Sequence, residues 1–361
     1  MNHLNALQEQ VKAYKLDGML ITSEPGEFYA LGLHTEGLII VTPKQCLCVT
    51  DGRYIEAAAA HIKDEGLSQL TLEQTKGKRS RYDIARDFIL QNGLREMGFE
   101  GEYVSVVNHK RMEKELPCHL IDTQVMLTDL RGCKTKEEQE VMKAAQKIAD
   151  GAFTEVLNFI KIGKTEQEIA AVIAYEMAKR GGLELSFSTI VACGTNGSRP
   201  HALPGDRPVA AGQFITMDFG CRYQGYCSDM TRTVALGSIT EEMDKVYHTV
   251  LKAQTTAIST IKGGMTGKEI DKIARDVIEE AGYGEFFSHS LGHSLGLEIH
   301  ESPNAAASVL SNLPQGVTIS VEPGIYLPEK FGVRIEDVVI LTETSCENIT
   351  NSPKELITLS V

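Results

Sequence analysis

Two stretches of the chain each carry a pair of carboxylates on either side of a turn-like segment. In FITMDFGCRYQGYCSDMTR, residues 214–232, Asp218 and Asp229 flank a polar, glycine-containing segment. Apolar and β-branched residues precede and follow that segment, a pattern that predicts a β-hairpin. A symmetric hairpin would have its midpoint between Tyr223 and Gln224 and would set the two aspartates opposite each other. Opposed like charges repel, so a fold that keeps them together needs a cation between them.

The second pair lies in VEPGIYLPEKFGVRIEDVVI, residues 321–340. Glu322 and Glu336 have their midpoint at Glu329, inside another turn-like segment, so a symmetric hairpin would again set two carboxylates face to face. One such pair alone could be solvated surface charge. Two pairs in strands apolar enough to be buried indicate more, because buried carboxylates are costly unless they are paired or bound to a metal.

A histidine-rich segment, SHSLGHSLGLEIHE at residues 288–301, lies between the two pairs. It holds His289, His293 and His300. The first two are four residues apart, as on one face of a helix, but the glycines among them favour a loop or the start of a strand. One neutral imidazole from this segment would complete a set of four carboxylates and one histidine.

This set of side chains predicts metal-dependent hydrolysis. Oxygen-rich ligand sets with one nitrogen suit Mn²⁺ and tolerate Co²⁺ or Zn²⁺. Five protein ligands with shared carboxylates can hold two divalent ions about 4 Å apart, and such a pair activates water and stabilises a developing oxyanion.

The composition excludes several other classes of protein. A length of 361 residues predicts about two domains, and 42% hydrophobic and 24% charged residues are typical of a globular protein. The net charge of −13 argues against a nucleic-acid partner, whose binding face would be basic. No stretch approaches a membrane span, and the N-terminus lacks the apolar core of a signal peptide. We therefore expect a cytoplasmic protein whose eight cysteines stay reduced.

The first third of the chain alternates predicted strands and helices, which indicates an α/β layer with a mixed or parallel sheet. The polar segment 128–136 is the expected boundary, giving domains of residues 1–128 and 129–361. The expected strands are 18–23, 37–42, 46–50, 97–101 and 118–123, and the expected helices are one that contains Leu4 to Tyr14, followed by 25–31, 53–61 and 82–91.

The second domain contains an internal repeat. The pattern K-x-G-x-T-x-x-E-I fits both 161–169 and 262–270, a separation of 101 residues, and each copy ends in a capping-box signature before a helix. The carboxylate pairs recur at nearly the same interval. Chance similarity of two capping boxes would not explain that coincidence, so we expect two helices and a hairpin in each half, with the metal site between the halves.

Five motifs in order resemble the M24 "pita-bread" metallopeptidases, and among these the Xaa-Pro aminopeptidases and prolidases. The resemblance implies a creatinase-like N-terminal α/β domain followed by a pita-bread catalytic domain with a pseudo-two-fold repeat. It also implies dinuclear hydrolysis of the Xaa-Pro bond, in dipeptides or at the N-terminus of peptides with proline in the second position, by a homodimer. The motifs are DFG at 218–220, SDMTRT at 228–233, SLGHSLGLEIHE at 290–301, VEPGIY at 321–326 and VRIED at 333–337.

The same resemblance assigns roles to the five ligand positions. Asp229 and Glu336 resemble carboxylates that bridge two ions. Asp218 resembles the ligand exclusive to one ion, and His293 and Glu322 resemble those exclusive to the other. Glu322 is also the residue expected to carry a proton to the leaving nitrogen.

Four further polar residues match outer positions of the family. His201, in the loop GSRPHALPGD at 197–206, matches a histidine beside the substrate. His289 and His300 match residues that contact substrate and polarise the scissile carbonyl. Arg334, two residues before Glu336 on one strand face, would orient a carboxylate. A loop histidine can also be merely solvated, and Arg334 can serve only to balance charge.

Two alternatives share the fold without this chemistry. A creatinase-type amidinohydrolase does not use these metal ligands, and a metal-free peptide-binding module has typically lost some of them. All five positions are occupied here, which disfavours both. Specificity for proline rests on the resemblance; the bond before proline has no N–H and is conformationally restricted, so a dedicated site is reasonable.

Overall fold

The computed structural model describes residues 3–361. Its chain forms two compact units, Met1–Arg131 and Gly132–Val361. The predicted domain boundary between residues 128 and 129 falls inside helix α6, shortly before the first unit ends, and it stays a prediction.

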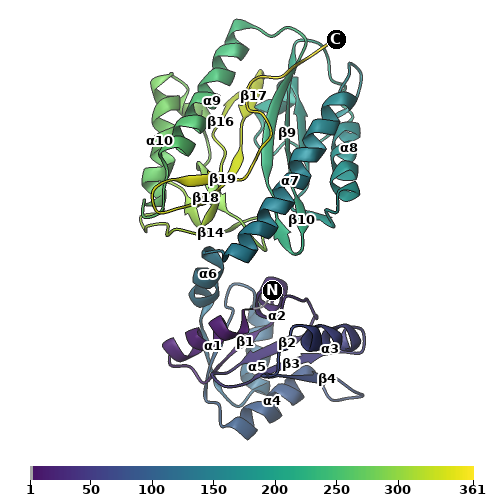
Figure 1. The fold of residues 1–361 in the computed structure, drawn as a ribbon, viewed down its shortest axis with the longest axis vertical. Coiled ribbons are helices and arrows are strands. Elements are labelled where there is room, and N and C mark those ends of the chain that lie inside the picture. Colours follow the sequence, from purple (N-terminus) through teal and green to yellow (C-terminus); the bar gives the residue numbers. More distant parts are fainter. Residues whose placement is uncertain (1–2) are drawn as a thin grey trace. The chain divides into compact units, whose positions relative to one another are not determined.

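The first unit is built on one six-stranded mixed sheet (Figure 1). The strand order is β4-β3-β2-β1-β5-β6, in which β1–β2 and β2–β3 are antiparallel and the remaining pairs are parallel. The mixed α/β layer expected from the sequence is confirmed. The elements are α1 (Leu4–Ala13), β1 (Gly18–Ile21), α2 (Glu24–Leu31), β2 (Leu38–Val41), β3 (Cys46–Thr50), α3 (Ile55–Asp64), β4 (Leu70–Gln74), α4 (Arg81–Asn92), β5 (Glu96–Phe99), α5 (Val106–Glu115), β6 (His119–Asp122) and α6 (Gln124–Gly132).

Apolar spacing explains how helices cover this sheet. Leu4, Leu7 and Val11 recur along α1 and are fully buried, as the helical period requires for a single apolar face. On α4, Tyr82 and Ile89 join the core cluster that includes the central strands. Every residue of β1, β2 and β3 is buried, which fits strands covered on both faces.

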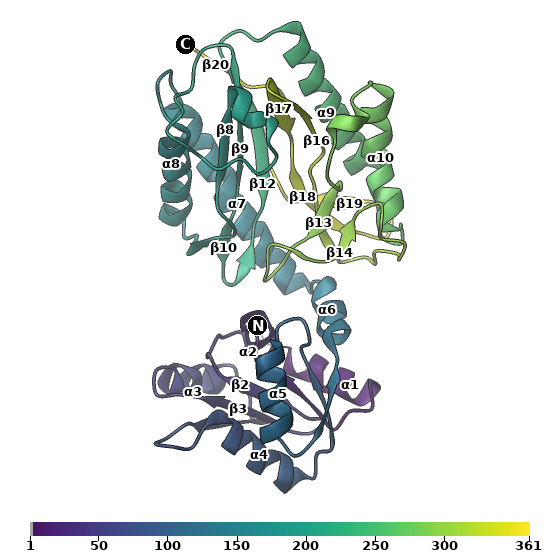
Figure 2. The same ribbon diagram turned by 180° about the vertical axis from the view of Figure 1, so that it is seen from behind.

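The second unit contains the predicted repeat (Figures 1 and 2). Helices α7 (Lys136–Phe159) and α8 (Glu166–Lys179) accompany the strands of the first half, and α9 (Glu241–Thr260) and α10 (Gly267–Glu280) accompany those of the second. Each half has an apolar core between its helices and strands, and the core of the second half also includes Phe214 and Ala235 from strands of the first. The capping boxes predicted at the start of α8 and at the start of α10 are both present, the first with Thr165 as its N-cap.

Two main sheets carry the strands of this unit. Their orders are β20-β12-β9-β8 and β14-β13-β15-β18-β19, with smaller sheets β11-β10-β7 and β16-β17. The strands and short helices are β7 (Glu184–Leu185), β8 (Ile190–Cys193), η1 (Gly194–Ser198), β9 (Gln213–Phe219), β10 (Cys221–Tyr223), β11 (Tyr226–Cys227), β12 (Met230–Leu236), η2 (Gly284–Phe286), β13 (Gly292–Ser294), β14 (Glu301–Ala305), β15 (Thr318–Val321), β16 (Gly324–Leu327), β17 (Phe331–Arg334), β18 (Asp337–Leu341), β19 (Cys346–Asn348) and β20 (Thr358–Leu359).

The register of the first hairpin differs from the prediction. Asp218 pairs with Thr231 rather than with Asp229. The turn lies at Gln224 and Gly225, both with positive φ, one residue later than the expected midpoint. Two successive positive φ angles are typical of a tight hairpin turn whose twist matches the strands. Because the resulting offset is two residues, both aspartates keep the same face.

The register of the second hairpin is as predicted. Gly324 pairs with Arg334 in one ladder, and Val321 pairs with Asp337 in the adjoining one. Glu322 and Glu336 lie between these two ladders and therefore face each other.

A buried arginine fastens both hairpins to the C-terminal segment. Arg232 donates to the carbonyl oxygens of Thr231 and Glu336 and to the carboxylate of Asp337. It also donates to the carbonyl oxygens of Ser352 and Pro353. Its side chain is only 1% exposed, so these bonds satisfy a guanidinium that water does not reach.

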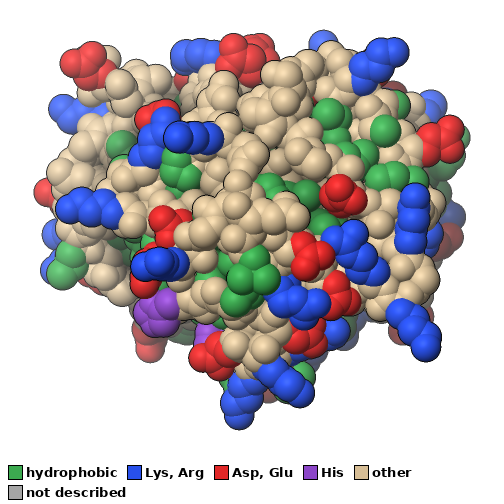
Figure 3. Space-filling model, turned by 90° about the horizontal axis from the view of Figure 1, so that it is seen from below, with side chains coloured by type: hydrophobic (Ala, Val, Ile, Leu, Met, Phe, Trp, Pro, Cys, Tyr) green, Lys and Arg blue, Asp and Glu red, His purple; other side chains and the backbone are tan. Residues whose placement is uncertain are grey.

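The surface is of mixed charge. Figure 3 shows basic and acidic side chains interspersed over one face, with small groups of apolar side chains between them. Among residues 3–361, no helix has the length and apolar character needed to cross a bilayer.

Candidate metal centre

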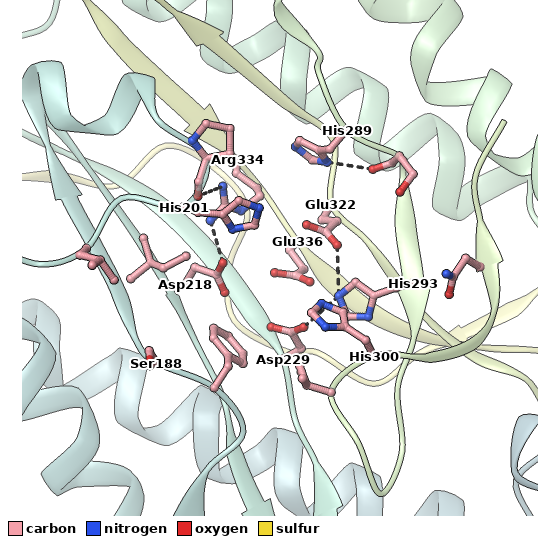
Figure 4. A pocket seen from close by; sticks show the side chains of 17 residues that line it. Ser188, His201, Asp218, Asp229, His289, His293, His300, Glu322, Arg334 and Glu336 are labelled. Atoms are coloured by element: carbon pink, nitrogen blue, oxygen red, sulfur yellow. Dashed lines mark hydrogen bonds and ion pairs between the residues drawn. The ribbon is translucent and has the colours of Figure 1, made fainter. Parts of the chain in front are cut away.

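All five predicted ligands line one cavity of about 530 Å³ in the second unit (Figure 4). Asp218 is near the end of β9, and Asp229 immediately precedes β12. His293 is in β13, Glu322 follows β15, and Glu336 joins β17 to β18. Strand ends from both halves therefore supply the carboxylates, and the segment between the hairpins supplies the imidazole.

Three of these residues form a tight group. Asp229, His293 and Glu336 each offer a ligand atom, and these atoms lie within 4.8 Å of one another. Glu322 joins them, because its Oε1 is 3.4 Å from Nε2 of His293. Asp218 lies in the same cavity, but its Oδ2 accepts a hydrogen bond of 2.7 Å from Arg334.

The imidazole of His293 is oriented as a metal ligand would be. Its Nδ1 lies 3.2 Å from the carbonyl oxygen of Ser294, which can only accept, so Nδ1 carries the proton. Burial lowers the pKa of His293 and keeps the ring neutral. Nε2 then presents a lone pair to Asp229 Oδ2 at 3.5 Å and to Glu322 Oε1. Lone pairs facing one another are stable only with a cation or a proton between them.

Several carboxylate oxygens in the cavity lack a partner. Among the described residues, Asp218 Oδ1, Asp229 Oδ1 and Glu336 Oε1 are buried and accept no hydrogen bond. Leaving a buried charged acceptor unsatisfied is costly. Bound cations would satisfy all three, so the residues present fit a divalent-metal site.

The crowded carboxylates resist ionisation in the metal-free protein. Burial, followed by the charges of Glu336, Asp218 and Glu322, raises the pKa of Asp229 well above its ordinary range. Burial and the charges of Glu322 and Asp218 do the same to the pKa of Glu336. Burial also raises the pKa of Glu322, although His289 and Arg334 oppose the shift. A divalent ion would replace the protons that these groups otherwise retain.

His289 and Arg334 meet through a tyrosine. Arg334 Nη1 donates to the hydroxyl of Tyr326 at 2.8 Å, and that hydroxyl lies 2.9 Å from Nε2 of His289. Nδ1 of His289 lies 2.8 Å from the carbonyl oxygen of Ser290 and so carries the ring proton. Nε2 therefore accepts from Tyr326, and one continuous chain of hydrogen bonds orients both predicted residues.

The other two predicted histidines lie at the margins of the cavity. The ring of His300 packs edge-on against His293, with 4.4 Å between ring centroids. Burial, and then His293 and His201, lower the pKa of His300. His201 lines the cavity from the loop after η1, but its side chain is exposed. The structure thus brings every predicted site residue to one cavity, at different depths.

Sequence reasoning missed the residues that support the predicted ligands. Thr231 donates to Glu336 Oε2 at 2.7 Å and accepts from Arg334 Nε at 3.0 Å. Ser320 donates to Glu322 Oε1 at 3.0 Å. Each lies two residues from a ligand on the same strand face, Thr231 after Asp229 and Ser320 before Glu322, and that spacing was the available signal. Tyr326 stood in the quoted motif VEPGIY without an assigned role.

Comparison with known proteins agrees with this geometry. The model of metallopeptidase family M24 matches residues 140–343, and that of the creatinase/prolidase N-terminal domain matches residues 3–133. The Xaa-Pro dipeptidase of Pyrococcus furiosus is 41% identical over 271 residues, covering 74% of this chain and 77% of that protein.

Solved structures show the same likeness over nearly the whole length. An Xaa-Pro dipeptidase from Bacillus anthracis superposes with a TM-score of 0.93 at 37% identity, covering 99% of both chains. An X-Pro aminopeptidase from Thermotoga maritima superposes with a TM-score of 0.91 at 34% identity, covering 99% of this chain and 100% of that one. The two-domain fold implied by the motifs is confirmed, and the chain belongs to metallopeptidase family M24.

Proposed function

We propose that the protein is an exopeptidase that hydrolyses the bond before proline, in dipeptides or at the N-terminus of longer peptides. The observation that carries the proposal is the lone pair of His293 Nε2, aimed at two carboxylates, Asp229 and Glu322, that belong to different hairpins. That arrangement supports a bound cation at a site shared by the two halves. Relatives named Xaa-Pro dipeptidase and X-Pro aminopeptidase supply the expected bond specificity.

Five residues would hold two divalent ions. We assign Asp229 and Glu336 as shared ligands, Asp218 to one ion, and His293 and Glu322 to the other. Four carboxylates and one imidazole favour Mn²⁺, with Co²⁺ or Zn²⁺ as substitutes. When bound, the ions supply Lewis acidity and a water molecule of lowered pKa.

The protein's own groups would then handle protons and position the peptide. Glu322 lines the cavity beside His293, so its carboxylate is placed to accept a proton and pass it to the leaving nitrogen. Desolvation lowers the pKa of His289 and, together with the neighbouring His293, that of the more exposed His300, and neutral imidazoles suit hydrogen bonding to a peptide carbonyl or amine. His201 would contact the substrate from the rim, and Arg334 would hold Asp218 in place.

The first experiment compares Ala-Pro, Ala-Pro-Ala and Ala-Ala as substrates. Metal-stripped protein should be inactive, and Mn²⁺ should restore cleavage of the first two but not the third. The ratio of the two proline rates would distinguish a dipeptidase from an aminopeptidase. Cleavage of none of them by protein with two bound ions would overturn the proline specificity, and failure to bind metal would favour a peptide-binding module.

Two further assignments belong to this proposal. A homodimer is implied by the family likeness, and a cytoplasmic location is carried over from the sequence-based expectation. Light scattering on the purified protein would test the first and cell fractionation the second.

A further inference from the structure

Outside the metal set, one buried carboxylate has its hydrogen bonds directed at the loop that carries His201. Glu166, the first residue of α8, is 1% exposed. Its Oε1 accepts from the main-chain N–H of Cys193 at 2.8 Å, and its Oε2 accepts from that of Gly205 at 3.0 Å. The side-chain amide of Asn196 donates to both oxygens at 3.0 Å. One carboxylate thus joins the two ends of the segment 194–205.

The same turn of α8 also holds the second arm of the loop through its backbone. The N–H groups of Glu166 and Gln167 donate to the carbonyl oxygens of Arg207 and Gly205. These are among the helix N-terminal donors that have no partner inside the helix. The start of a helix also favours a negative charge, which suits a carboxylate at this position.

The loop so closed reaches the catalytic cavity. Gly197 lies against Gly332 of β17, so closely that a Cβ at 332 would overlap the oxygen of Gly197. The carbonyl oxygen of Pro200 accepts from Arg334 Nη1 at 3.3 Å. The next residue, His201, is exposed at the cavity rim. The loop that carries it is thus held at its two ends by Glu166 and near Pro200 by Arg334.

We propose that Glu166 is a positioning residue: by clamping Cys193, Asn196 and Gly205 it holds His201 at the mouth of the metal cavity. This positioning role rests on the proposed function, because it takes His201 to contact the substrate. Glu166 would touch neither substrate nor metal, and it would act through the loop alone.

Glu166→Gln is the decisive variant. An amide has one acceptor oxygen in place of two, so its NH₂ group must face either the N–H of Cys193 or that of Gly205. The matched control is Glu168→Gln, two residues along the same helix. Glu168 is exposed, and its carboxylate bonds Thr165 and Lys164 rather than the loop.

Hydrogen exchange gives a reading that does not need activity. Glu166→Gln should speed amide exchange in residues 194–206 by about tenfold. That factor is expected when one hydrogen bond is lost and the new NH₂ group faces a main-chain N–H. Glu168→Gln should leave that segment unchanged. Should Glu166→Gln fail to fold, Asn196→Ala would open the same clamp from the other side. Unchanged exchange in the folded variant would overturn the clamp.

Kinetics then tests whether the clamp acts through His201. Glu166→Gln should lower kcat/KM about tenfold with metal content intact. The relative changes in KM and in kcat should match those caused by His201→Ala. The double variant should be no slower than His201→Ala alone. A further tenfold loss in the double variant would overturn the positioning role. If the unaltered enzyme cleaves no proline peptide, the proposed function fails, and the exchange result still decides the clamp.

Discussion

The two halves of the catalytic unit follow one plan but use it differently. Each begins with a capped helix that leads to a hairpin bearing two carboxylates. In the second half, Glu322 and Glu336 face each other across the hairpin, whereas in the first half Asp218 faces Thr231 and Asp229 lies on a diagonal. Repetition supplies the predicted ligands. The difference in register places Asp218 within a hydrogen bond of Arg334, while Asp229 joins the tight group with His293 and Glu336.

The helix starts differ as well. Where the first half has Glu166, the second has Gly267 at the matching position of the repeated pattern. The glycine lets the carbonyl oxygen of Asn304 approach so closely that a Cβ would overlap it. Further along α10, Asp271 accepts from the N–H of Leu291 and pairs with Arg275, which donates to the carbonyl oxygen of His289. A loop is fastened by a carboxylate in both halves, but from different turns of the helix.

Removal of one ligand from each half tests whether both hairpins serve one site. Asp229→Ala and Glu336→Ala should each reduce kcat more than about a thousandfold, because each removes an oxygen proposed to be shared by both ions. Circular dichroism and metal analysis should show a retained fold and fewer bound ions. Near-normal turnover in either variant would refute the shared site.

His300 lies in the second half, in contact with His293 but outside the proposed ligand set. His300→Ala should keep the metal content and lower kcat by about a hundredfold, the size typical of a lost proton-transfer or polarising group. Steady-state kinetics with the metal content measured on the same sample provides the check. Kinetics equal to those of the unaltered enzyme would return His300 to a packing role.

The raised carboxyl pKa values involve both hairpins and predict a pH dependence of metal binding. Burial and crowding raise the pKa of Asp229 in one hairpin, and of Glu322 and Glu336 in the other. Folded metal-free protein then holds more protons than the unfolded chain just above the ordinary carboxyl pKa, so its unfolding free energy falls as pH rises through that window.

Metal displaces those protons, so stabilisation by Mn²⁺ should grow with pH. An Mn²⁺ concentration a hundredfold above the dissociation constant adds about 2.7 kcal/mol. Melting temperatures with and without metal at pH 5 and pH 8 would measure this, and we expect the larger increase at pH 8. An increase independent of pH would contradict the assignment of these carboxylates as ligands.

Gly267→Ala tests the close approach that is special to the second half. A methyl group there would overlap the backbone of Asn304, and we expect a loss of about 1–3 kcal/mol in the unfolding free energy, typical of overpacking. Lys268→Ala, at the exposed next position, is the control for urea unfolding. A Gly267→Ala protein as stable as the control would show that the backbone at Asn304 can move away at little cost in free energy.

We expect the smallest changes in unfolding free energy from the capping boxes, which the two halves share. Thr165→Ala and Thr266→Ala each remove the side-chain oxygen of a capping box, at a cost of about 1 kcal/mol. The two losses in unfolding free energy should be equal within error. A clear difference between them would show that the repeat is not equivalent even at its caps.

Some of this architecture could be predicted because single residues dictate it. The capping boxes and the second hairpin follow from local signals, and Glu329 at its tip adopts a positive φ. The first hairpin was placed wrongly because Gln224 is an uncommon residue for a turn with two positive φ angles, so the true turn was less evident than the symmetry of the aspartates.

Elements with few apolar residues were also missed. Strand β4 buries one residue, Leu70, and α5 buries one residue, Met112, so neither produced a clear hydrophobic period. The segment expected to be a linker contains most of α6. At the site, the four carboxylates were accessible from residue type, and the family resemblance singled out His293 among three histidines. The contact of Tyr326 with His289, in contrast, depends on how distant segments pack.

The bonds of Arg232 bear on the order in which the molecule can assemble during synthesis. A nascent chain emerges N-terminus first, yet this guanidinium joins the first hairpin to Glu336, Asp337 and the carbonyl oxygens of Ser352 and Pro353. The buried positive charge therefore lacks most of its partners until residues 336–353 have left the ribosome. We expect the proposed metal site to form only after that segment has emerged, later than the first unit, whose strands and helices are complete by Arg131.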